Sequence, residues 1–526
     1  MISRLPISGT TEKTTEILVY GATPGGIASA CVAAELGAQV LLVDPGPAVG
    51  GHLTSGICTT ECEHMLPVSF YGWMLTFMRQ LGLRYGLDAP LHRWEPKVAQ
   101  DVYISMLDAA GVSILLNTRL EQVKIDGGRI RQAHTNGIVI KADYWIDASY
   151  EGDLMAMAGI PYAVGREARE TYGESLAGIR FIDSLDEVAN SKNHACRIDR
   201  LWEMNLLDDQ CCWLDGILPS DGQHLRRGAG DGKVMNYHYR VTVSKGANRL
   251  PFPRPPQYRE ERFELLVRFL HANPDTPLTG ILAFLDHPSG QYRIGADGFT
   301  EVIPGDKWEL NNLQGSVLSL GNLGGQFGYP DGDWATREGI IADHYEYNAG
   351  LLYFLANSTR IPGAIRHSMQ AWGLPPDEYP DNDHWPYQPY IRETRRMQGA
   401  YIMTQKDILD ECTKPDGIYL NSHWIDCHHV QRLALDDRHF RNEGRIWKEV
   451  TEPYAVPYRS ITPRGEDCTN LLVPGCLSAS HVAYCSIRLE SSWMGLGEAA
   501  GKAVVRALRD AKAVQEVSIR DFSLPV

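Results

Sequence analysis

A strand, a glycine-rich turn, a helix and a second strand follow one another within residues 16–44, and this order constrains the fold more than any other feature of the sequence. The apolar run 17–20 is typical of a strand buried in a parallel sheet. The alanine-rich segment 27–36 predicts a helix, which Gly37 ends because glycine favours the position after a helix C-terminus. A second apolar run, 39–43, leads to Asp44. We therefore predict a βαβ unit within an α/β, Rossmann-like fold.

The turn between the first strand and the helix predicts a dinucleotide site. Gly21 permits the tight turn, and Gly26 allows the helix to pack closely against the strand. The helix N-terminus offers N–H groups and a partial positive charge to a pyrophosphate, and Asp44 at the strand end can accept ribose hydroxyls. Thr23 stands where the second glycine of G-x-G-x-x-G is expected. The flanking strand, helix and acid therefore carry the prediction, and an ordinary βαβ turn without a ligand is the alternative.

The residues after Asp44 favour FAD over NAD. A nicotinamide domain normally continues directly into its next helix, whereas residues 45–56 here are rich in glycine and other small residues. This stretch resembles the loop beneath the flavin in FAD enzymes of the glutathione-reductase type, where small residues let the backbone approach the cofactor. A third strand at 112–117, an antiparallel meander over 123–140 and a returning strand at 144–149 complete the strand order of an FAD domain.

The closing half of the FAD domain lies far along the chain. A buried strand at 470–475 ends in Gly475, and a helix rich in glycine and alanine follows at 493–503. The dipole of that helix would stabilise negative charge on the flavin; a small-residue helix that only packs on a sheet is the alternative. We expect residues 15–160 to form the first part of the FAD-binding domain and residues 465–510 its closing part. Residues 161–464 would form an inserted α+β substrate-binding or cap domain, which can include further FAD-domain segments, with a strand at 237–243 and helices at 258–272 and 337–355.

The expected FAD contacts are the turn, loop and strand-end positions of these segments, one meander position and the last helix. They are Gly21, Thr23, Pro24, Gly25, Gly26, Asp44, Pro45, Gly50, Gly51, His52, Thr54, Val123, Ala148, Ser149, Gly475, Ser478, Leu496 and Gly497. His52 departs from the apolar residue expected beside the flavin. It is either a hydrogen-bonding neighbour of the cofactor, which we favour, or a site of covalent flavin attachment.

Longer motifs add a family resemblance that covers residues 15–508. They are the segments 19–26, 147–154, 164–168, 390–397, 426–432, 477–483 and 487–488. Together they resemble the FAD-dependent oxidoreductase family, which includes proteins labelled xanthan lyase-like in genomes. The resemblance implies a two-domain flavoprotein with a glutathione-reductase-type FAD fold, and it does not imply lyase chemistry.

Histidine suits the proton transfer that accompanies hydride transfer, because its ordinary pKa is about 6.5. His481 is the first candidate, since it follows the flavin-proximal strand by a few residues. His428 and His429 are the next candidates, in a polar cluster with Asp426 and Arg432. A structural role is the alternative for each histidine.

Four arginines are candidates for a carboxylate clamp, because a guanidinium group binds a carboxylate through two parallel hydrogen bonds. They are Arg392, Arg395, Arg396 and Arg488, of which we expect Arg392 and Arg488 in the catalytic site. Salt bridges to neighbouring glutamates within a domain interface are the alternative.

These features predict an FAD-dependent oxidoreductase that dehydrogenates a small polar metabolite at a CH–OH or CH–NH group by hydride transfer to the flavin. The arginines also fit a fumarate-reductase-like desaturase or reductase of a carboxylate substrate. Further alternatives are a lyase or isomerase that uses flavin without net redox change, and a protein whose flavin is structural or sensory.

Composition limits the other partners. The formal net charge of −15, from 65 acidic and 50 basic side chains, argues against nucleic acid or an anionic membrane surface. No apolar run has the length of a signal peptide or a membrane span, and the eleven cysteines show no zinc or iron–sulfur spacing. We therefore expect a cytoplasmic protein with reduced cysteines and no metal. Since no second glycine motif predicts an NAD(P)H site, electrons would pass to an external acceptor, either oxygen or a carrier. Homo-oligomerisation stays open.

Overall fold

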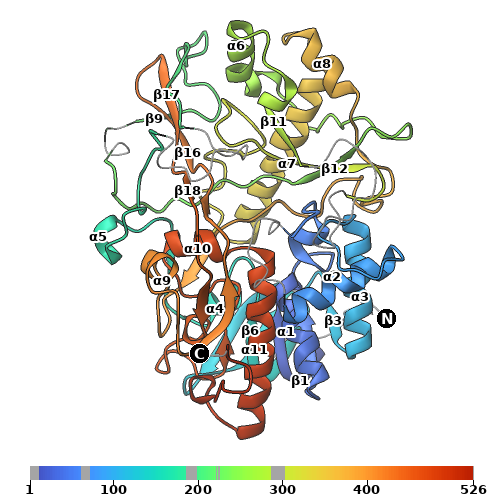
Figure 1. Ribbon diagram of the computed structural model, residues 1–526, viewed down its shortest axis with the longest axis vertical. Helices are drawn as coiled ribbons and strands as arrows, with labels where there is room; N and C mark the ends of the chain where they lie inside the picture. Colours follow the sequence, from blue (N-terminus) through green and yellow to red (C-terminus); the bar gives the residue numbers. More distant parts are fainter. Residues whose placement is uncertain are drawn as a thin grey trace.

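The computed structural model describes residues 11–60, 71–184, 198–220, 222, 226–285 and 303–524. A seven-stranded sheet in the order β3-β2-β1-β6-β5-β4, with β20 also paired to β6, forms the lower half of the molecule in Figure 1. Its strands are β1 (Thr11–Tyr20), β2 (Val40–Val43), β3 (Ser113–Leu115), β4 (Leu120–Asp126), β5 (Arg129–Thr135), β6 (Ile138–Asp147) and β20 (Leu471–Leu472).

The register of this sheet gathers three strand ends at one edge. β1 is parallel to both neighbours, so that Tyr20 pairs with Val43 on β2 and with Asp147 on β6. Gly21 and Asp44 directly follow two of these ends. Ligands of parallel α/β sheets bind outside the carboxyl ends of the strands, and this edge is therefore where a cofactor site is expected.

The meander differs from the prediction in one respect. β6 is a single ten-residue strand, whereas the sequence predicted separate strands near 138–140 and 144–149. Residues 139–141 pair with β5, residues 145–146 pair with β20, and the strand pairs with β1 along most of its length. Lys141 and Asp143 do not break the strand, because their side chains stay partly or fully exposed while the strand runs on beside β1.

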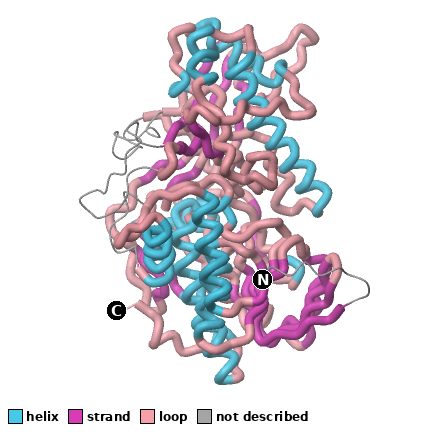
Figure 2. Tube along the Cα trace, turned by 90° about the vertical axis from the view of Figure 1, so that its right-hand side faces the viewer, coloured by secondary structure: helices cyan, strands magenta, loops and turns pink. Residues whose placement is uncertain are grey.

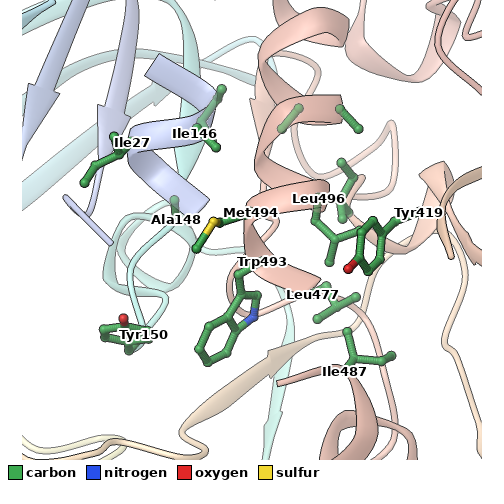
Figure 3. Packing of buried hydrophobic residues seen from close by; sticks show 14 of the residues in the cluster. Ile27, Ile146, Ala148, Tyr150, Tyr419, Leu477, Ile487, Trp493, Met494 and Leu496 are labelled. Atoms are coloured by element: carbon green, nitrogen blue, oxygen red, sulfur yellow. The ribbon is translucent and has the colours of Figure 1, made fainter. Parts of the chain in front are cut away.

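Segments from opposite ends of the chain pack together beside the sheet. α1 (Pro24–Glu35) lies along α11 (Glu490–Asp510), and a Cβ on Gly497 would lie 2.1 Å from the Gly25 carbonyl oxygen. Ser29 Oγ lies 2.9 Å from the carbonyl oxygens of both Gly25 and Gly497. Figure 3 shows the apolar packing around α11, where Leu496 lies beside Tyr419. The C-terminal part of the chain thus packs against the sheet-containing half through α11 and β20.

Further helices and short elements surround this core. They are η1 (Gly51–Thr54), α2 (Gly72–Arg84), α3 (Pro96–Ala110), α4 (Asp153–Met157), α5 (Arg169–Tyr172), α9 (Gln405–Leu409), η7 (Tyr458–Ser460), α10 (His481–Ile487) and η8 (Val514–Glu516). Short sheets connect the core to the upper region. They pair β7 (Tyr162–Val164) with β13 (Arg395–Met397), β14 (Gly417–Asn421) with β19 (Tyr454–Pro457), and β15 (Ile425–Cys427) with β18 (Ile446–Lys448).

The upper region in Figure 1 has its own hydrophobic cluster and comes from the middle of the chain. It contains an antiparallel sheet of β10 (Val241–Ser244), β12 (Lys307–Asn312) and β11 (Leu282–Leu285), and a second sheet of β8 (Trp202–Glu203), β17 (His439–Glu443), β16 (Gln431–Ala434) and β9 (Leu218–Pro219). Its helices are η5 (Glu260–Phe263), α6 (Glu264–Ala272), η6 (Leu278–Gly280), α7 (Trp334–Asn357) and α8 (Gly363–Gln370). The tube view in Figure 2 shows this region stacked on the sheet-containing half.

Two predicted elements in the middle of the chain differ from the observed ones. The strand covers residues 241–244 rather than 237–243, and the helix expected at 258–272 begins as a 3-10 turn before α6. The long helix expected at 337–355 is present as α7. Within the described residues, no helix is both long and apolar enough to cross a membrane.

Candidate active site

A cavity of about 370 Å³ opens at the carboxyl edge of the parallel strands. The β1–α1 turn, the end of β2, the loop around η1, the end of β6, the β3–β4 connection, and α7 with nearby loops all contribute to its wall. The lining residues are Thr23, Asp44, Pro45, Gly46, Pro47, Ala48, Gly51, Ser55, Asn117, Arg119, Asn136, Ser149, Tyr150, Glu151, Tyr329, Trp334, Arg337, Glu338, Ile341, Tyr387 and Gln388. A cavity with these walls spans the two regions of the fold.

Asp44 is held in place at the end of β2. Its Oδ2 accepts the Ala22 N–H at 2.6 Å, and its Oδ1 accepts the Gly46 N–H at 2.7 Å. Burial raises the pKa of Asp44 to about 6, although these two N–H groups act in the opposite direction. The carboxylate is thus fixed against the cavity as a charged acceptor at neutral pH.

The turn before α1 is shaped by glycines and capped by Thr23. The Thr23 hydroxyl accepts the Gly26 N–H at 3.1 Å and donates to the Ala148 carbonyl at 2.8 Å. A Cβ on Gly26 would lie 1.8 Å from the Gly21 carbonyl oxygen, and Gly21 has a φ of 102°. These positions therefore accept only glycine without rearrangement, and they aim the N-terminus of α1 at the cavity.

The glycine-rich loop after Asp44 is fastened to that turn. The Gly50 N–H donates to the Ala22 carbonyl at 2.8 Å, and Thr54 Oγ1 donates to the Val49 carbonyl at 2.7 Å. Gly50 and Gly51 both have positive φ values, 98° and 54°. The loop and the β1–α1 turn thus form one rigid wall of the cavity.

These residues fit FAD. The half-buried acid at the end of β2 suits the ribose of the adenosine, and the N-terminus of α1 suits the pyrophosphate. The small residues of the loop leave room for backbone to lie against a flat ring. Of the expected contacts, Thr23, Asp44, Pro45, Gly51 and Ser149 line the cavity. Bound FAD would supply a ring system that accepts a hydride from a substrate carbon.

The remaining expected contacts lie behind or beside the cavity wall. Gly21, Pro24, Gly25, Gly26, Gly50, Thr54, Ala148 and Gly475 shape or support the strand ends and turns. The structure does not bring four others to the cavity. Val123 lies on β4, Ser478 Oγ accepts the Gly399 N–H at 3.0 Å, and Leu496 and Gly497 lie in the packing of α11, which begins at Glu490 rather than at residue 493.

We predict that Asp44→Asn weakens FAD binding about 10- to 100-fold, because a charge-assisted hydrogen bond to the ribose is lost. The measurement is fluorescence titration of FAD-free protein with FAD. Wild-type affinity should fall as the pH drops through about 6, where Asp44 takes up its proton, and the variant should lose this pH dependence. In the FAD-free protein, the raised pKa means that ionisation of Asp44 destabilises the folded state as the pH rises above 4. At pH 8, Asp44→Asn should therefore be at least as stable as the wild type. An unchanged FAD affinity would contradict the assignment.

His52 lies on η1 with both ring nitrogens engaged. Nε2 accepts the Ile391 N–H at 3.1 Å, so the ring hydrogen is on Nδ1, which donates to Glu490 Oε1 at 2.7 Å. The ring is stacked on Tyr150 at 3.8 Å, and the Tyr150 hydroxyl donates to the same glutamate oxygen at 2.7 Å. Burial, with nearby Arg392, lowers the pKa of His52 well below its ordinary value. This arrangement favours a neutral hydrogen-bonding histidine over a site of covalent flavin attachment.

Beside His52, three buried arginines surround the ring of Tyr390. We call Arg240, Arg392 and Arg488 the arginine cluster; their guanidinium carbons lie 5.6, 4.6 and 5.9 Å from the ring centroid. The Tyr390 ring in turn meets the edge of the His52 ring at 4.8 Å. Arg240 contacts Glu309, and Arg488 donates to the Tyr390 hydroxyl at 3.0 Å and lies 3.4 Å from an oxygen of Asp426. The cluster therefore concentrates positive charge next to the glycine-rich loop.

Arg392 differs from the other two members of the cluster. Its Nη1 donates to the Asn236 carbonyl at 2.6 Å, and its Nη2 donates to His238 Nδ1 at 2.9 Å. No carboxylate of the described residues pairs with it, although its side chain is fully buried. Burial, together with Arg488 and Arg240, lowers the pKa of Arg392 to about 9. A buried cation without a counter-charge is costly, and an anionic ligand would relieve that cost.

The structure separates the three histidine candidates. His428 Nε2 lies 3.2 Å from Gln314 Nε2 and 3.4 Å from Asp426 Oδ2, and its Nδ1 has no hydrogen-bond partner within the described part of the chain. Burial, with Arg392, lowers the pKa of His428 to about 3. His429 Nε2 instead contacts Asp199 at 2.7 Å. Of the three candidates in the described chain, His428 is the one with a buried ring nitrogen that lacks a hydrogen-bond partner.

His481 lies in a different environment. Its Nδ1 contacts Glu393 at 2.8 Å, and its Nε2 lies 3.4 Å from Cys427 Sγ. Burial lowers the pKa of His481, but Glu393 and Cys427 raise it more, to about 10. With both nitrogens engaged, His481 is poorly placed to accept a substrate proton, and the geometry does not favour the general-base role that its position in the sequence suggested.

Arg395 and Arg396 are paired as the alternative interpretation expected. Arg395 contacts Asp153 at 2.8 Å and Asp331 at 2.9 Å. Arg396 contacts Glu393 and also Glu167, the latter at 2.6 Å. Both arginines thus hold structural segments together.

Sequence reasoning missed the contributions of the upper region to the cavity. Trp334 and Arg337 enter from α7, and Arg337 forms a buried ion pair with Asp153 at 2.8 Å. No local pattern marks these residues, because only the tertiary fold brings α7 to the sheet edge. Asn117 was within reach of prediction, since it lies at the end of the strand expected at 112–117; the observed strand β3 ends at Leu115, and Asn117 lies two residues beyond it with a positive φ of 54°.

Comparison with known proteins decides the family. The family model described as FAD dependent oxidoreductase matches residues 16–524. The chain belongs to this family. Its members use FAD, and the protein is accordingly an FAD-dependent oxidoreductase of mixed α/β structure. No curated protein sequence matches the chain significantly.

The following three solved structures each match this FAD-dependent oxidoreductase over part of the chain. L-amino acid deaminase from Proteus vulgaris is 14% identical with a TM-score of 0.23, and the match covers 31% of this chain and 54% of that one. L-proline dehydrogenase from P. horikoshii is 16% identical with a TM-score of 0.24, covering 30% and 59%. A geranylgeranyl bacteriochlorophyll reductase-like protein from Thermoplasma acidophilum is 18% identical with a TM-score of 0.20, covering 28% and 43%. The matches thus span about half of each of those chains, and scores this low say nothing about the substrate.

Proposed function

We propose that this oxidoreductase dehydrogenates a small metabolite that carries a carboxylate or similar anionic group, at a CH–OH or CH–NH bond. The observation that carries the proposal is Arg392, a fully buried guanidinium with two arginine neighbours and no carboxylate partner in the described chain. An anionic substrate group would supply the missing counter-charge. The neighbouring loop around η1 fits the FAD that takes up the hydride.

His428 is the group we assign to the substrate proton. Oxidation of a CH–OH or CH–NH group releases a proton from oxygen or nitrogen as the hydride leaves carbon. In the tautomer whose Nε2–H points to Asp426 Oδ2, Nδ1 of His428 carries the lone pair that can accept that proton. Because Asp426 also contacts Arg488, the histidine and the arginine cluster are positioned by one carboxylate.

The two regions of the fold support a separation of cofactor binding from substrate binding. In this proposal, residues 15–160 and 465–510 form a glutathione-reductase-type FAD domain, and the insertion 161–464 supplies most of the substrate site. The insertion contributes Arg240, Arg392 and His428, whereas Arg488 comes from the closing segment. The substrate would then lie between the insertion and the flavin loop.

The test is an anaerobic screen of the FAD-loaded protein for bleaching of the flavin absorption. Hydroxy acids and amino acids are each compared with the matched neutral alcohol or amine. The proposal expects bleaching by carboxylate-bearing donors and little by their neutral partners. Equal bleaching by charged and neutral donors would contradict a role for the arginine cluster in substrate binding.

We predict that His428→Gln lowers kcat by about 10²- to 10⁴-fold, the range for loss of a general base, with a smaller change in KM. FAD content should be unchanged, since His428 does not line the cavity. His429→Gln is the matched control: it removes a contact with Asp199 and should cost stability without a comparable loss of kcat. Similar kcat values for His428→Gln and wild type would remove His428 from the mechanism.

The arginine cluster also supports a second function, flavin-dependent reduction or desaturation next to a carboxylate. This reaction is distinguished by the oxidant: an unsaturated dicarboxylate such as fumarate should reoxidise the reduced flavin under anaerobic conditions. For the dehydrogenase, we propose an external acceptor, either oxygen or a carrier.

A further inference from the structure

Two thiols and an imidazole converge on one point outside the cavity. Cys427 ends β15, while His481 and Cys485 lie on α10 at positions i and i+4, and hence on one face of the helix. His481 Nε2 lies 3.4 Å from Cys427 Sγ and 3.8 Å from Cys485 Sγ. The three ligand atoms all lie within 4.8 Å of one another, and all three side chains are buried.

These separations match those of a tetrahedral metal centre. With a Zn–S distance of about 2.3 Å and a Zn–N distance of about 2.0–2.1 Å, a tetrahedral angle places sulfur and nitrogen about 3.5 Å apart. The two observed S···N distances lie on either side of this value. The distances are therefore compatible with one ion bound by all three atoms.

The opposite side of the imidazole is arranged as in metal-binding histidines. Nδ1 of His481 contacts both oxygens of Glu393, at 2.8 and 3.0 Å. A metal-ligating histidine commonly donates its second N–H to a carboxylate, which fixes the ring orientation and leaves the other nitrogen for the metal. Glu393 is itself held by Arg396. The site thus has an organised second layer of contacts.

We propose that Cys427, His481 and Cys485 bind a zinc ion, with a fourth position that no His, Cys, Asp or Glu of the described chain fills. Two thiolates neutralise the charge of the ion, so that the buried site carries no net charge, and the metal takes the place of the proton on Nε2. A hydrolase-like triad of Cys427, His481 and Glu393 would need only one thiol and an exposed one. The convergence of two buried thiols on the same nitrogen favours a metal instead.

The position of this zinc site indicates a bracing role. It ties α10 to β15, the strand that carries Asp426, and α10 leads directly to Arg488. Loss of the ion should therefore shift α10 and β15, and with them Arg488 and its contact Asp426. The proposal does not depend on the identity of the substrate, because its test measures metal content and the ligand atoms of the metal.

A second group of three side chains in the described chain lies equally close together, but a lysine already lies among them. Glu95, Asp377 and Glu378 also lie close together. Their oxygens contact Lys307 Nζ at 2.5, 2.8 and 2.7 Å, so the ammonium group already supplies the positive charge. At Cys427, His481 and Cys485 the positive charge in the described chain is instead the proton shared with the His481 imidazole, and the metal would take the place of that proton on Nε2.

The test is metal analysis of the full-length FAD-loaded protein, purified without a metal-affinity tag or chelator, by inductively coupled plasma mass spectrometry. We expect stoichiometric zinc, and X-ray absorption at the zinc edge should show two sulfur ligands and at least one nitrogen. Cys427→Ser and Cys485→Ser should lose the zinc, and Glu393→Gln should weaken zinc affinity about 10- to 100-fold. Cys468→Ser, another buried cysteine, is the matched control and should keep it.

The wild-type spectrum keeps the proposal testable even if the variants fail to fold. Zinc bound only through oxygen and nitrogen would overturn it. A metal-free protein would also overturn it, whether thiol titration finds Cys427 and Cys485 free or joined in a disulfide. None of these outcomes depends on FAD content or turnover, so they are distinguishable from failure of the proposed function.

Discussion

Arg392→Met is expected to weaken binding of carboxylate ligands about 100-fold or more. Methionine keeps much of the side-chain volume and removes the charge that an anionic group would pair with, and losing one partner of a buried charge pair costs about 2–5 kcal/mol. The measurement is titration of the oxidised flavin spectrum with succinate, with its neutral diamide as a matched probe. The wild type should respond to succinate far more strongly than to the diamide, and the variant should lose that preference.

Two further arginine variants sharpen this result. Arg392→Lys keeps a charge but loses the planar fork, so it should bind succinate with intermediate affinity. Arg432→Met removes another buried arginine, one that contacts Asn442 and the Gly216 carbonyl away from the flavin loop, and should leave the response to succinate unchanged. Wild-type succinate binding by Arg392→Met would show that the buried charge serves another purpose.

Gly26→Ala is expected to reduce the FAD content of the purified protein to less than about a tenth of wild type and to lower its melting temperature. The added Cβ would lie 1.8 Å from the Gly21 carbonyl oxygen, which is backbone and cannot swing aside. The turn and α1 must therefore separate, which moves the helix N-terminus away from the cavity. FAD content is measured by absorption after release from the protein, and melting by circular dichroism.

The matched control for this change is Gly339→Ala on α7. A Cβ at Gly339 meets nothing within 4 Å, so the same methyl group should be harmless, and helix propensity should stabilise the protein by up to about 1 kcal/mol. If Gly26→Ala kept its FAD and stability, the close packing of the turn against α1 would not be required for cofactor binding.

The FAD half of the fold was predictable because its signals are local or follow from a fixed strand order. The run from β1 to Asp44 carries its own turn glycines, and a parallel sheet brings the ends of β1, β2 and β6 together. The contact of α1 with α11 was not predicted: the glycine and alanine positions of the last helix indicated an approach to the flavin ring or to the sheet, and the structure places Gly497 and Gly501 against α1. The single strand β6 could not be predicted from its two separate apolar runs, because the exposure of residues 141–143 depends on the neighbouring strand.

For the substrate site, the sequence predicted candidate residues but not which of them come together in the fold. The sequence marked Arg392 and Arg488 as candidates, but Arg240 joins them through tertiary contacts with Tyr390. Among the histidines, proximity to the flavin-side strand favoured His481, whereas the structure engages both of its nitrogens and leaves His428 open. The sequence indicated no metal, because the spacing of Cys427, His481 and Cys485 matches no familiar zinc motif until β15 and α10 lie together.

The most direct test is the visible absorption spectrum of the purified protein, recorded before and after acid precipitation. We predict a yellow protein with stoichiometric flavin that passes into the supernatant as FAD, because His52 is hydrogen-bonded at both nitrogens rather than available for a covalent link. Flavin that stays with the pellet would contradict that assignment of His52. A colourless protein that also fails to take up added FAD would contradict the cofactor site built from Thr23, Asp44 and the glycine-rich loop.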